Sequence, residues 1–579
     1  MIPIMRQMRK SALEKFDRLI IIKWLSVAVV AIIASRLIYI QVIQHPVYSA
    51  LAQEQYDVFK KLFPDRGRIF AQNKASGEIY PVAINDEQYE IYAIPRRIKE
   101  PDNLARTLAP FLEMEESEIF TALSDKNETY HLLKRKVVRE INDRIMELSL
   151  KGIGSRSETM RFYPEKNVFS HAVGFLGFKG SQRAGQYGVE GTLNEILAGQ
   201  SGYLNDFFAL SSASAAGHKS FEEAKDGADI VLTIDRTIQF TACTKLRDAV
   251  LNHGAEKGAV IVMNPKNGEI WAICSYPDFD PNEYQKIEDA SFFNNSAIFQ
   301  AYEPGSTFKA ITMAAGLDKG LVDPQTIHTD TGSVTIGKYT IRNADGKVYG
   351  RQTMTQVLEN SVNTGAIFVA NKVGGINLEN FIRQLGFGEK TGIELSGESK
   401  GNITALAKHK DIYIATASYG QGITTTPIQM IRAYATMANG GYLVKPTVIK
   451  EIRGSDGQIV NPQNQSRTRV FSERTSLLIS AMLGSVVENG HGKRAGVKGY
   501  YIGGKTGTAQ VAKEKGSGYD PDKSIGSFIG YGPIDNPQFV MLAKIDNPKD
   551  VKFAESTAAP LFGEIAQFLV QYLKIPPSR

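Results

Sequence analysis

The chain has 579 residues, of which 42% are hydrophobic and 22% are charged. At about 150 residues per domain this length predicts three or four units, and the composition excludes a largely disordered chain. The net charge of +6 is spread without a dense Lys/Arg run, so we expect no nucleic-acid groove, whereas a membrane surface or an anionic cell wall fits the mild basic bias.

The N-terminus has the pattern of a membrane anchor. Basic residues outnumber acidic ones in residues 1–18, and an apolar stretch follows over residues 19–43. As a helix this stretch would be about 37 Å long, enough to cross a hydrocarbon core of about 30 Å. Lys23 and Arg36 lie toward its ends, where long side chains reach the headgroups.

We therefore predict a cytoplasmic tail at 1–18, an uncleaved transmembrane anchor at 19–43 and the rest of the chain on the far side of the membrane. A cleaved signal peptide and a buried core helix are the alternatives. No clean small-residue cleavage site follows the apolar stretch, which favours the anchor.

Residues 44–226 are predicted to form an elongated mixed α/β pedestal domain. Short β-like segments at 82–84 and 89–92 alternate with helical patterns at 102–123 and 136–150. No compact catalytic constellation is present in this region. A Ser/Ala-rich patch, residues 211–217, is predicted to be a linker or an exposed loop.

Residues 227–579 have the sequence pattern of an α+β domain. Strands from both ends of this region surround a helical middle, so we expect one antiparallel sheet flanked by helices. The predicted elements are a strand at 230–234, a helix from an Asp235 cap to Asn252, a hairpin over 258–274, strands at 526–531 and 539–545, and a terminal helix at 564–573.

Two cysteines, Cys243 and Cys274, exclude a disulfide-dense scaffold. The sequence leaves open whether they form one bridge, and two small buried thiols are the favoured interpretation. No His-Glu-x-x-His or Cys-x-x-Cys pattern is present, so we expect neither a metal site nor another cofactor.

The first candidate for chemistry is Ser306-Thr307-Phe308-Lys309, which follows Pro304-Gly305 at a predicted helix start. On a helix Lys309 lies on the same face as Ser306, three residues earlier. A serine hydroxyl is a poor nucleophile without a base, and a lysine amine can be that base if burial lowers its pKa. By itself Ser-x-x-Lys is expected by chance about twice in a chain of this length. The pattern therefore indicates a catalytic site only if other motifs accompany it.

Two later segments supply those partners. Ser361-Val362-Asn363 lies 55 residues on (361 − 306 = 55), and its hydroxyl and amide could relay a proton and hold a carbonyl. Helix capping is the ordinary alternative for this triplet.

Lys505-Thr506-Gly507-Thr508 follows a double glycine and precedes a β-like segment. Lys505 and the threonine hydroxyls suit a carboxylate, and Gly507 would let a substrate approach the strand backbone. An ordinary turn into a strand is the alternative. Lys390-Thr391-Gly392 has similar letters but follows a loop-like stretch without the double glycine, so we reject it as the catalytic strand.

These three motifs, in this order, resemble those of penicillin-binding proteins and serine β-lactamases. The order of tail, anchor, pedestal and catalytic domain resembles class B penicillin-binding proteins. Residues 527–531 and the segment after Gly420 resemble the septal (division) type more than the elongation type. The segments that carry the class B resemblance are 302–309, 420–427 and 505–510, with 66–69, 161–164 and 188–191 in the pedestal. Residues 70–74 depart from the Asp-Arg-Asn-Gly that often continues the first pedestal motif, which bears on the subfamily and not on the chemistry.

The resemblance implies a penicillin-binding transpeptidase fold, a peptidoglycan D,D-transpeptidase and a location at the bacterial inner membrane, with the catalytic domain outside the cytoplasm. Its implied partners are stem peptides ending in D-Ala-D-Ala, an acceptor amine, β-lactams as covalent inhibitors, the membrane, a separate membrane glycosyltransferase and other cell-wall synthesis or division proteins. The implied roles are nucleophile for Ser306, base for Lys309, proton relay for Ser361 and Lys505, peptide orientation for Asn363 and Thr506, substrate contact for Gly507, and an oxyanion hole from the N–H groups of Ser306 and Thr508.

The motifs do not separate a transpeptidase from a D,D-carboxypeptidase or a β-lactam-hydrolysing enzyme of the same fold, nor the septal from the elongation type. The large pedestal and the anchor favour transpeptidation. A signalling sensor and a non-catalytic scaffold are disfavoured by the short N-terminal tail and the intact motifs. His491 is expected to be solvated in its Gly-rich loop, and residues 513–523 to be a surface connection.

Overall fold

The computed structural model describes residues 3–39, 41, 63–180, 182–205, 220–344, 346–462, 467–513 and 518–579. Contacts between residues divide the chain into two units. One unit consists of Met1–Pro64 and Gln200–Lys225, and the other of Asp65–Gly199 and Asp226–Arg579.

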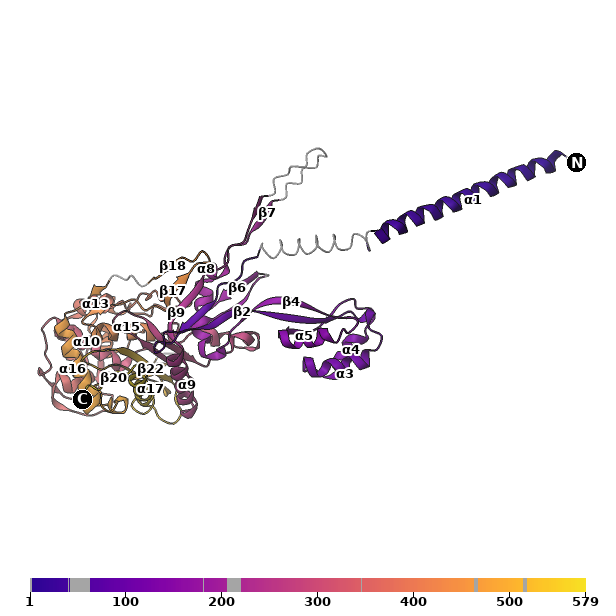
Figure 1. Ribbon diagram of the computed structural model, residues 1–579. Helices are drawn as coiled ribbons and strands as arrows, with labels where there is room; N and C mark the ends of the chain where they lie inside the picture. Colours follow the sequence, from indigo (N-terminus) through magenta and orange to yellow (C-terminus); the bar gives the residue numbers. More distant parts are fainter. Residues whose placement is uncertain are drawn as a thin grey trace. The chain divides into compact units, whose positions relative to one another are not determined.

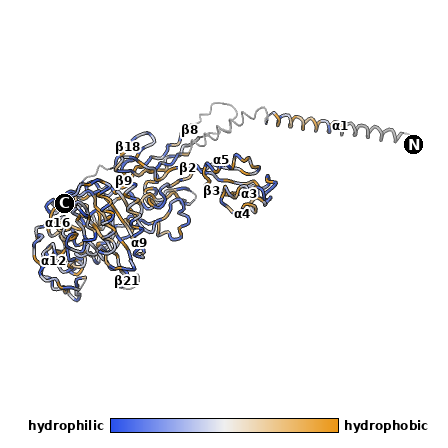
Figure 2. Tube along the Cα trace, turned by 60° about the horizontal axis from the view of Figure 1, so that its bottom comes forward, coloured by the Kyte–Doolittle hydropathy of each residue, from blue (hydrophilic) through white to orange (hydrophobic). Residues whose placement is uncertain are grey.

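The first unit contains a long N-terminal helix, α1 (Pro3–Ile38). Its segment Ile20–Ile38 is long and apolar enough to cross a membrane. The hydropathy colouring shows the apolar character of the described part of this helix (Figure 2). This helix fits a single-pass anchor and covers most of the predicted span at 19–43; residues 40, 42 and 43 lie outside the described residues. Strands β7 (Tyr203–Asn205) and β8 (Ser220–Glu222) pair antiparallel, and the patch predicted as a linker lies in the undescribed stretch between them.

The second unit contains a seven-stranded sheet that crosses the predicted boundary at residue 226. Strand β1 runs parallel to β9, with Ile69 opposite Ile230, so the pedestal and the C-terminal region share one sheet. The predicted strands at 82–84 and 89–92 are one strand, β2. The sheet has the order β18 (Ile459–Val460), β17 (Ile449–Arg453), β9 (Asp229–Asp235), β1 (Ile69–Gln72), β2 (Ile79–Ala93) and β3 (His131–Val137), with β4 (Ile153–Phe162) also paired to β2.

Strands β2 and β4 lead to a small helical cluster with its own apolar core (Figure 1). Its helices are α3 (Pro101–Leu112), α4 (Glu116–Ser124) and α5 (Arg139–Glu147). The single helix predicted at 102–123 is wrong, because Glu113 adopts a left-handed conformation with φ of 49° and ends α3.

A buried ion cluster joins the three pedestal motifs. The Glu190 carboxylate is fully buried and accepts hydrogen bonds from Arg161 Nε at 2.7 Å and Arg66 Nε at 2.8 Å. The Tyr163 hydroxyl also donates to it, at 3.4 Å. Each charge therefore has a partner inside the pedestal, so the three motifs hold its segments together.

A second sheet, of five antiparallel strands, organises the C-terminal region. Successive residues of its strand β22 alternate between two apolar cores, one containing Leu542 and the other Met541. The first core takes in α10, α15 and α16, and the second α9 and α17, so helices cover both faces as predicted. The strand order is β11 (Ile270–Tyr276), β10 (Lys257–Met263), β22 (Phe539–Asp546), β21 (Tyr519–Gly532) and β20 (Gly503–Ala512), and the covering helices are α9 (Arg236–Asn252), α10 (Lys309–Asp318), α15 (Pro427–Ala438), α16 (Glu473–Asn489) and α17 (Ala558–Tyr572).

Several predicted details of this region are confirmed. Asp235 caps α9 by accepting hydrogen bonds from the N–H groups of Thr237 and Ile238, at 2.9 and 2.8 Å, and β10 and β11 form the expected hairpin. The remaining elements are β5 (Phe175–Lys179), β6 (Gln182–Gln186), α6 (Ser170–Val173), α7 (Gly188–Thr192), α8 (Asn194–Ala198), β12 (Ile327–Asp330), β13 (Ser333–Ile336), β14 (Tyr339–Arg342), β15 (Gly350–Thr353), α11 (Met354–Glu359), α12 (Asn363–Val373), α13 (Gly375–Gln384), α14 (Asp411–Ser418), β16 (Tyr442–Leu443), β19 (Thr468–Arg469) and short 3-10 turns, η2 to η8.

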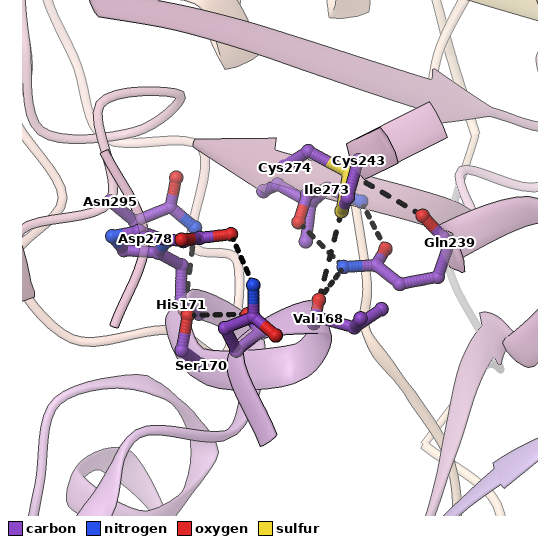
Figure 3. The surroundings of a disulfide bond; sticks show 10 residues. Val168, Ser170, His171, Gln239, Cys243, Ile273, Cys274, Asp278 and Asn295 are labelled. Atoms are coloured by element: carbon purple, nitrogen blue, oxygen red, sulfur yellow. Dashed lines mark hydrogen bonds between the residues drawn. A yellow bond between two sulfur atoms is a disulfide. The ribbon is translucent and has the colours of Figure 1, made fainter. Parts of the chain in front are cut away.

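Cys243 on α9 and Cys274 on β11 form a disulfide, so the preference for two unbonded thiols is wrong (Figure 3). Gln239 packs beside the bond and ties the same two elements together: its Nε2 donates to Ile273 O at 3.0 Å, and its Oε1 accepts from the Ile273 N–H at 2.9 Å. The spacing of 31 residues gave no signal for this pairing, because it depends on how α9 packs on β11.

Candidate active site

The Ser-x-x-Lys segment forms the 3-10 turn η6 (Gly305–Phe308) followed directly by α10. Three residues per 3-10 turn bring Ser306 and Lys309 to the same face, as the helical spacing predicts. Ser306 is half-buried, whereas Lys309 is 1% exposed. Gly305 has a φ of +56°, which favours glycine, and this sharp entry presents Ser306 at the start of the turn.

The segment around Gly420 holds this turn in place. The Gly305 N–H donates to Gly420 O at 3.1 Å, and a Cβ on Gly420 would lie 2.2 Å from Gly305 O. Tyr302 and Thr425 exchange two backbone hydrogen bonds, each of 2.9 Å. The segment that resembles class B proteins therefore forms the support on which the Ser306 turn rests.

Ser361 lies between α11 and α12 and connects the two lysines. Its Oγ is 3.2 Å from Lys309 Nζ and 3.1 Å from Lys505 Nζ, and its carbonyl also accepts a hydrogen bond from Lys309. Ser361 has a φ of 55°, an uncommon conformation for a residue with a side chain, and such strain is typical of functional sites. The ordinary reading of Ser361 as a helix cap does not account for this position between two amines.

Lys505 on β20 is fully buried, and burial lowers its pKa to about 7. At neutral pH a large fraction of this side chain is therefore the free amine, which can accept a proton. Its Nζ also donates to Thr506 O at 3.1 Å, so the amine is fixed beside Ser361.

Strand β20 forms one edge of the five-stranded sheet, and the Ser306 turn packs on it at Gly507. A Cβ on Gly507 would lie 2.8 Å from Pro304 O and 2.9 Å from Thr307 Cγ2. The missing side chain thus admits the Ser306 turn, and the expected contact between a substrate and the backbone at Gly507 stays a prediction.

Ser306, Ser361, Thr506 and Thr508 line one cavity of about 130 Å³. The structure therefore brings all three motifs together, and both lysines reach the cavity through Ser361. Lys390-Thr391-Gly392 lies elsewhere in a loop, where the Thr391 hydroxyl donates to Glu398 at 2.6 Å, so its rejection is confirmed.

Asn363 is placed beside this cavity and not among the residues that line it. Its Nδ2 donates to Arg342 O at 2.9 Å, and its N–H donates to Asn343 Oδ1 at 3.0 Å. In this structure the Asn363 amide holds the segment that carries Asn343, and its role in orienting a peptide stays a prediction.

Other residues that line the cavity were not predicted from the sequence. Asn343 and Tyr349 line it, and both are held by buried Asp330: Asn343 Nδ2 and the Tyr349 N–H donate to its carboxylate at 2.9 and 2.7 Å. Phe553, which is 67% exposed, lines it from the segment after β22. These residues lie outside the three motifs and gave no local signal.

His491 and Glu555 also line the cavity, with 3.2 Å between His491 Nδ1 and a Glu555 carboxylate oxygen. The prediction of a merely solvated His491 is therefore incomplete, because the side chain is half-exposed and faces the cavity of Ser306. Within the part of the chain that the structure describes, no group of three or more His, Cys, Asp or Glu is placed to hold a metal ion.

Comparison with known proteins agrees with this arrangement. Residues 258–567 match the model of the penicillin binding protein transpeptidase domain, and residues 61–232 that of the penicillin-binding protein dimerisation domain. Among similar proteins are stage V sporulation protein D of Bacillus subtilis, 33% identical over 99% of this chain and 88% of that protein, and the probable peptidoglycan D,D-transpeptidase PbpC of Pseudomonas aeruginosa, 30% identical over 97% and 96%.

Solved structures show the same fold. The crystal structure of penicillin binding protein 3 from Mycobacterium tuberculosis in complex with aztreonam has a TM-score of 0.69 at 25% identity, covering 89% of this chain and 98% of that one. A peptidoglycan synthetase from Bifidobacterium adolescentis has a TM-score of 0.70 at 27% identity, covering 90% and 97%. The chain belongs to the class B penicillin-binding proteins, with a dimerisation domain followed by a transpeptidase domain.

Proposed function

We propose that the protein is a peptidoglycan D,D-transpeptidase that cross-links stem peptides through an acyl-enzyme on Ser306. The observation that carries this proposal is the single cavity in which Ser306 and Ser361 meet the edge strand β20, with Ser361 Oγ within 3.2 Å of both lysine Nζ atoms. That arrangement supplies a nucleophile, a base and a proton path.

In the first half-reaction Ser306 Oγ attacks the carbonyl carbon of the penultimate D-Ala, and its proton passes to Lys309. The negative charge on the carbonyl oxygen is stabilised by the backbone N–H groups of Ser306 and Thr508, and a donor of this kind is worth about 3 kcal/mol in comparable sites. The C–N bond then breaks, and a proton passes through Ser361 and Lys505 to the departing D-Ala.

The donor peptide binds along β20. An edge strand offers backbone groups to an extended peptide, and Thr506 and Thr508 of this strand line the cavity. Thr506, whose hydroxyl accepts a hydrogen bond from buried Lys505 at 3.4 Å, then meets the terminal carboxylate, and Asn363 and Thr506 orient the peptide. In the second half-reaction an acceptor amine attacks the acyl-enzyme and releases Ser306.

Septal wall synthesis is the process that the comparisons favour. Relatives include a peptidoglycan D,D-transpeptidase FtsI homolog from Mesostigma viride, 28% identical over 99% of this chain. The solved relative with aztreonam supports β-lactams as inhibitors of this site. A fluorescent fusion should gather at the division plane, and an even distribution along the side wall would instead favour the elongation role.

The catalytic region is proposed to lie outside the cytoplasm, with the N-terminus inside. The basic residues that precede the apolar part of α1 support this orientation. The Cys243–Cys274 disulfide supports it independently, because such bonds persist in oxidising compartments. Protease added to intact spheroplasts should digest the catalytic region, and full protection would contradict the orientation.

The enzymatic test uses the purified full-length protein in detergent, a peptide ending in D-Ala-D-Ala and a labelled primary amine. Release of D-Ala with transfer of the peptide to the amine is the expected result. Release of D-Ala with only hydrolysed peptide would replace the transpeptidase by a D,D-carboxypeptidase of the same fold.

A further inference from the structure

His491 and Glu555 form a pair in the lining of the Ser306 cavity, and the acylation step described above uses neither residue. His491 follows α16, and its backbone N–H donates to Glu359 O at 3.4 Å. Glu555 belongs to the segment between β22 and α17. The two side chains meet at 3.2 Å, and both line the cavity.

The position of Glu555 is fixed relative to the reacting strand. The N–H of its neighbour Ala554 donates to Thr508 Oγ1 at 3.1 Å. The side chains of Glu555 and His491 are 47% and 45% exposed, so a ligand that enters the cavity can reach them. Glu555 is therefore an accessible carboxylate held beside the strand that receives the donor peptide.

The charges around the cavity favour a role for the Glu555 carboxylate in binding a cationic group. Lys309 and Lys505 are buried and point to Ser361, and positive charge on either disfavours an approaching ammonium group. A primary amine with a pKa near that of lysine, about 10.4, arrives protonated at neutral pH. Among the residues that line this cavity, Glu555 is the one with a carboxylate.

We propose that Glu555 binds the primary ammonium group of the acceptor, and that His491 is a positioning residue that holds the Glu555 carboxylate. This inference rests on the proposed transpeptidase function and names the acceptor side of the same site. The bound ammonium gives one proton through Glu555 to water. The free amine nitrogen then forms a bond to the acyl carbon, the bond from that carbon to Ser306 Oγ breaks, and the second amine proton passes to Oγ.

The test separates charge recognition from general damage to the site. The Ser306 acyl-enzyme is formed from a peptide ending in D-Ala-D-Ala and offered either Nα-acetyl-lysinamide, which carries a primary ammonium, or hydroxylamine, which is uncharged at neutral pH. The ratio of amine transfer to hydrolysis is measured for the wild type and for Glu555→Gln. For Glu555→Gln the ratio should fall roughly tenfold with acetyl-lysinamide, the size of effect expected when a charged hydrogen bond is lost. With hydroxylamine the ratio should stay within about twofold of the wild-type value.

A second His–carboxylate pair in the same chain provides the matched control. His253 Nδ1 lies 2.9 Å from Asp550, in the same segment after β22, and neither residue lines the cavity. Asp550→Asn should leave both transfer ratios unchanged. For His491→Asn, which removes the positioning contact, the apparent KM for acetyl-lysinamide should rise while penicillin acylation of Ser306 keeps its rate.

The outcomes distinguish this inference from the proposed function. A protein that forms no Ser306 acyl-enzyme would overturn the transpeptidase proposal itself. An acyl-enzyme that forms normally, and whose Glu555→Gln variant transfers to acetyl-lysinamide as well as the wild type does, would overturn the role of Glu555 alone. An equal loss with both nucleophiles would also overturn it, because charge recognition predicts a loss with the ammonium only.

Discussion

The hydroxyl of Ser361 lies 3.1 Å from Lys505 Nζ, which joins the second and third motifs across 144 residues of sequence (505 − 361 = 144). The same hydroxyl is 3.2 Å from Lys309, so one oxygen connects the amine of the proposed base to the buried amine on β20. This contact joins the three motifs along the proposed path of the proton.

Ser361→Ala should lower the rate of acylation by a penicillin by roughly 10²- to 10⁴-fold, the usual contribution of positioned proton transfer. Stopped-flow fluorescence with a fluorescent penicillin measures this rate. Thr121→Val is the control, because its hydroxyl donates only within α4. Acylation at the wild-type rate in Ser361→Ala would show that the relay is not needed.

Lys505 should make the folded state more stable as the pH rises from about 7 to about 10. Its folded pKa is about 7, whereas an unfolded lysine titrates near 10.4, so in this range the unfolded chain binds a proton that the folded chain lacks. Stability therefore increases with pH, by about 4 kcal/mol at most. The melting temperatures of wild type and Lys505→Met are measured across this pH range in detergent. The wild type should gain stability relative to the variant as the pH rises. A constant difference between the two melting temperatures would contradict the lowered pKa.

Gly507→Ala should slow acylation without unfolding the protein. The added Cβ would lie 2.8 Å from Pro304 O and would push the Ser306 turn away from β20. A misplacement on the scale of 1 Å costs about 10²-fold in rate. The rate with a fluorescent penicillin and the melting temperature are measured on the same sample. An unchanged rate would mean that the turn tolerates the methyl group.

Glu190→Ala should destabilise the pedestal strongly. Its removal leaves Arg161, which is 3% exposed, without its carboxylate, and breaking a buried pair costs about 3–5 kcal/mol. The matched control is Glu158→Ala, which breaks a half-exposed pair with Arg183 and should cost at most about 1 kcal/mol. Thermal unfolding of both variants compares them, and equal effects would contradict the role given to burial.

The three motifs could be picked out from the sequence because each lies within a short segment. Ser306 and Lys309 are joined by local helical geometry, and the hairpin of β10 and β11 by its Asn-Pro-Lys-Asn-Gly turn. The α9 cap at Asp235 is local in the same way. Local steric and hydrogen-bonding preferences are sufficient for such features.

Features that depend on distant segments were missed. The sheet that joins β1 to β9 crosses the expected domain boundary, and the Cys243–Cys274 bond depends on how α9 packs on β11. The approach of Pro304 to Gly507 and the pairing of His491 with Glu555 likewise arise only in the folded chain. No spacing within the sequence specifies contacts of this kind.

Ser306 is proposed to be the nucleophile that forms a covalent acyl-enzyme. Intact-protein mass spectrometry after incubation with a penicillin tests this role, with wild type compared with Ser306→Ala. The wild type should gain the mass of one penicillin and the variant should gain none. No adduct on the wild type, or the same adduct on the variant, would show that Ser306 is not the nucleophile.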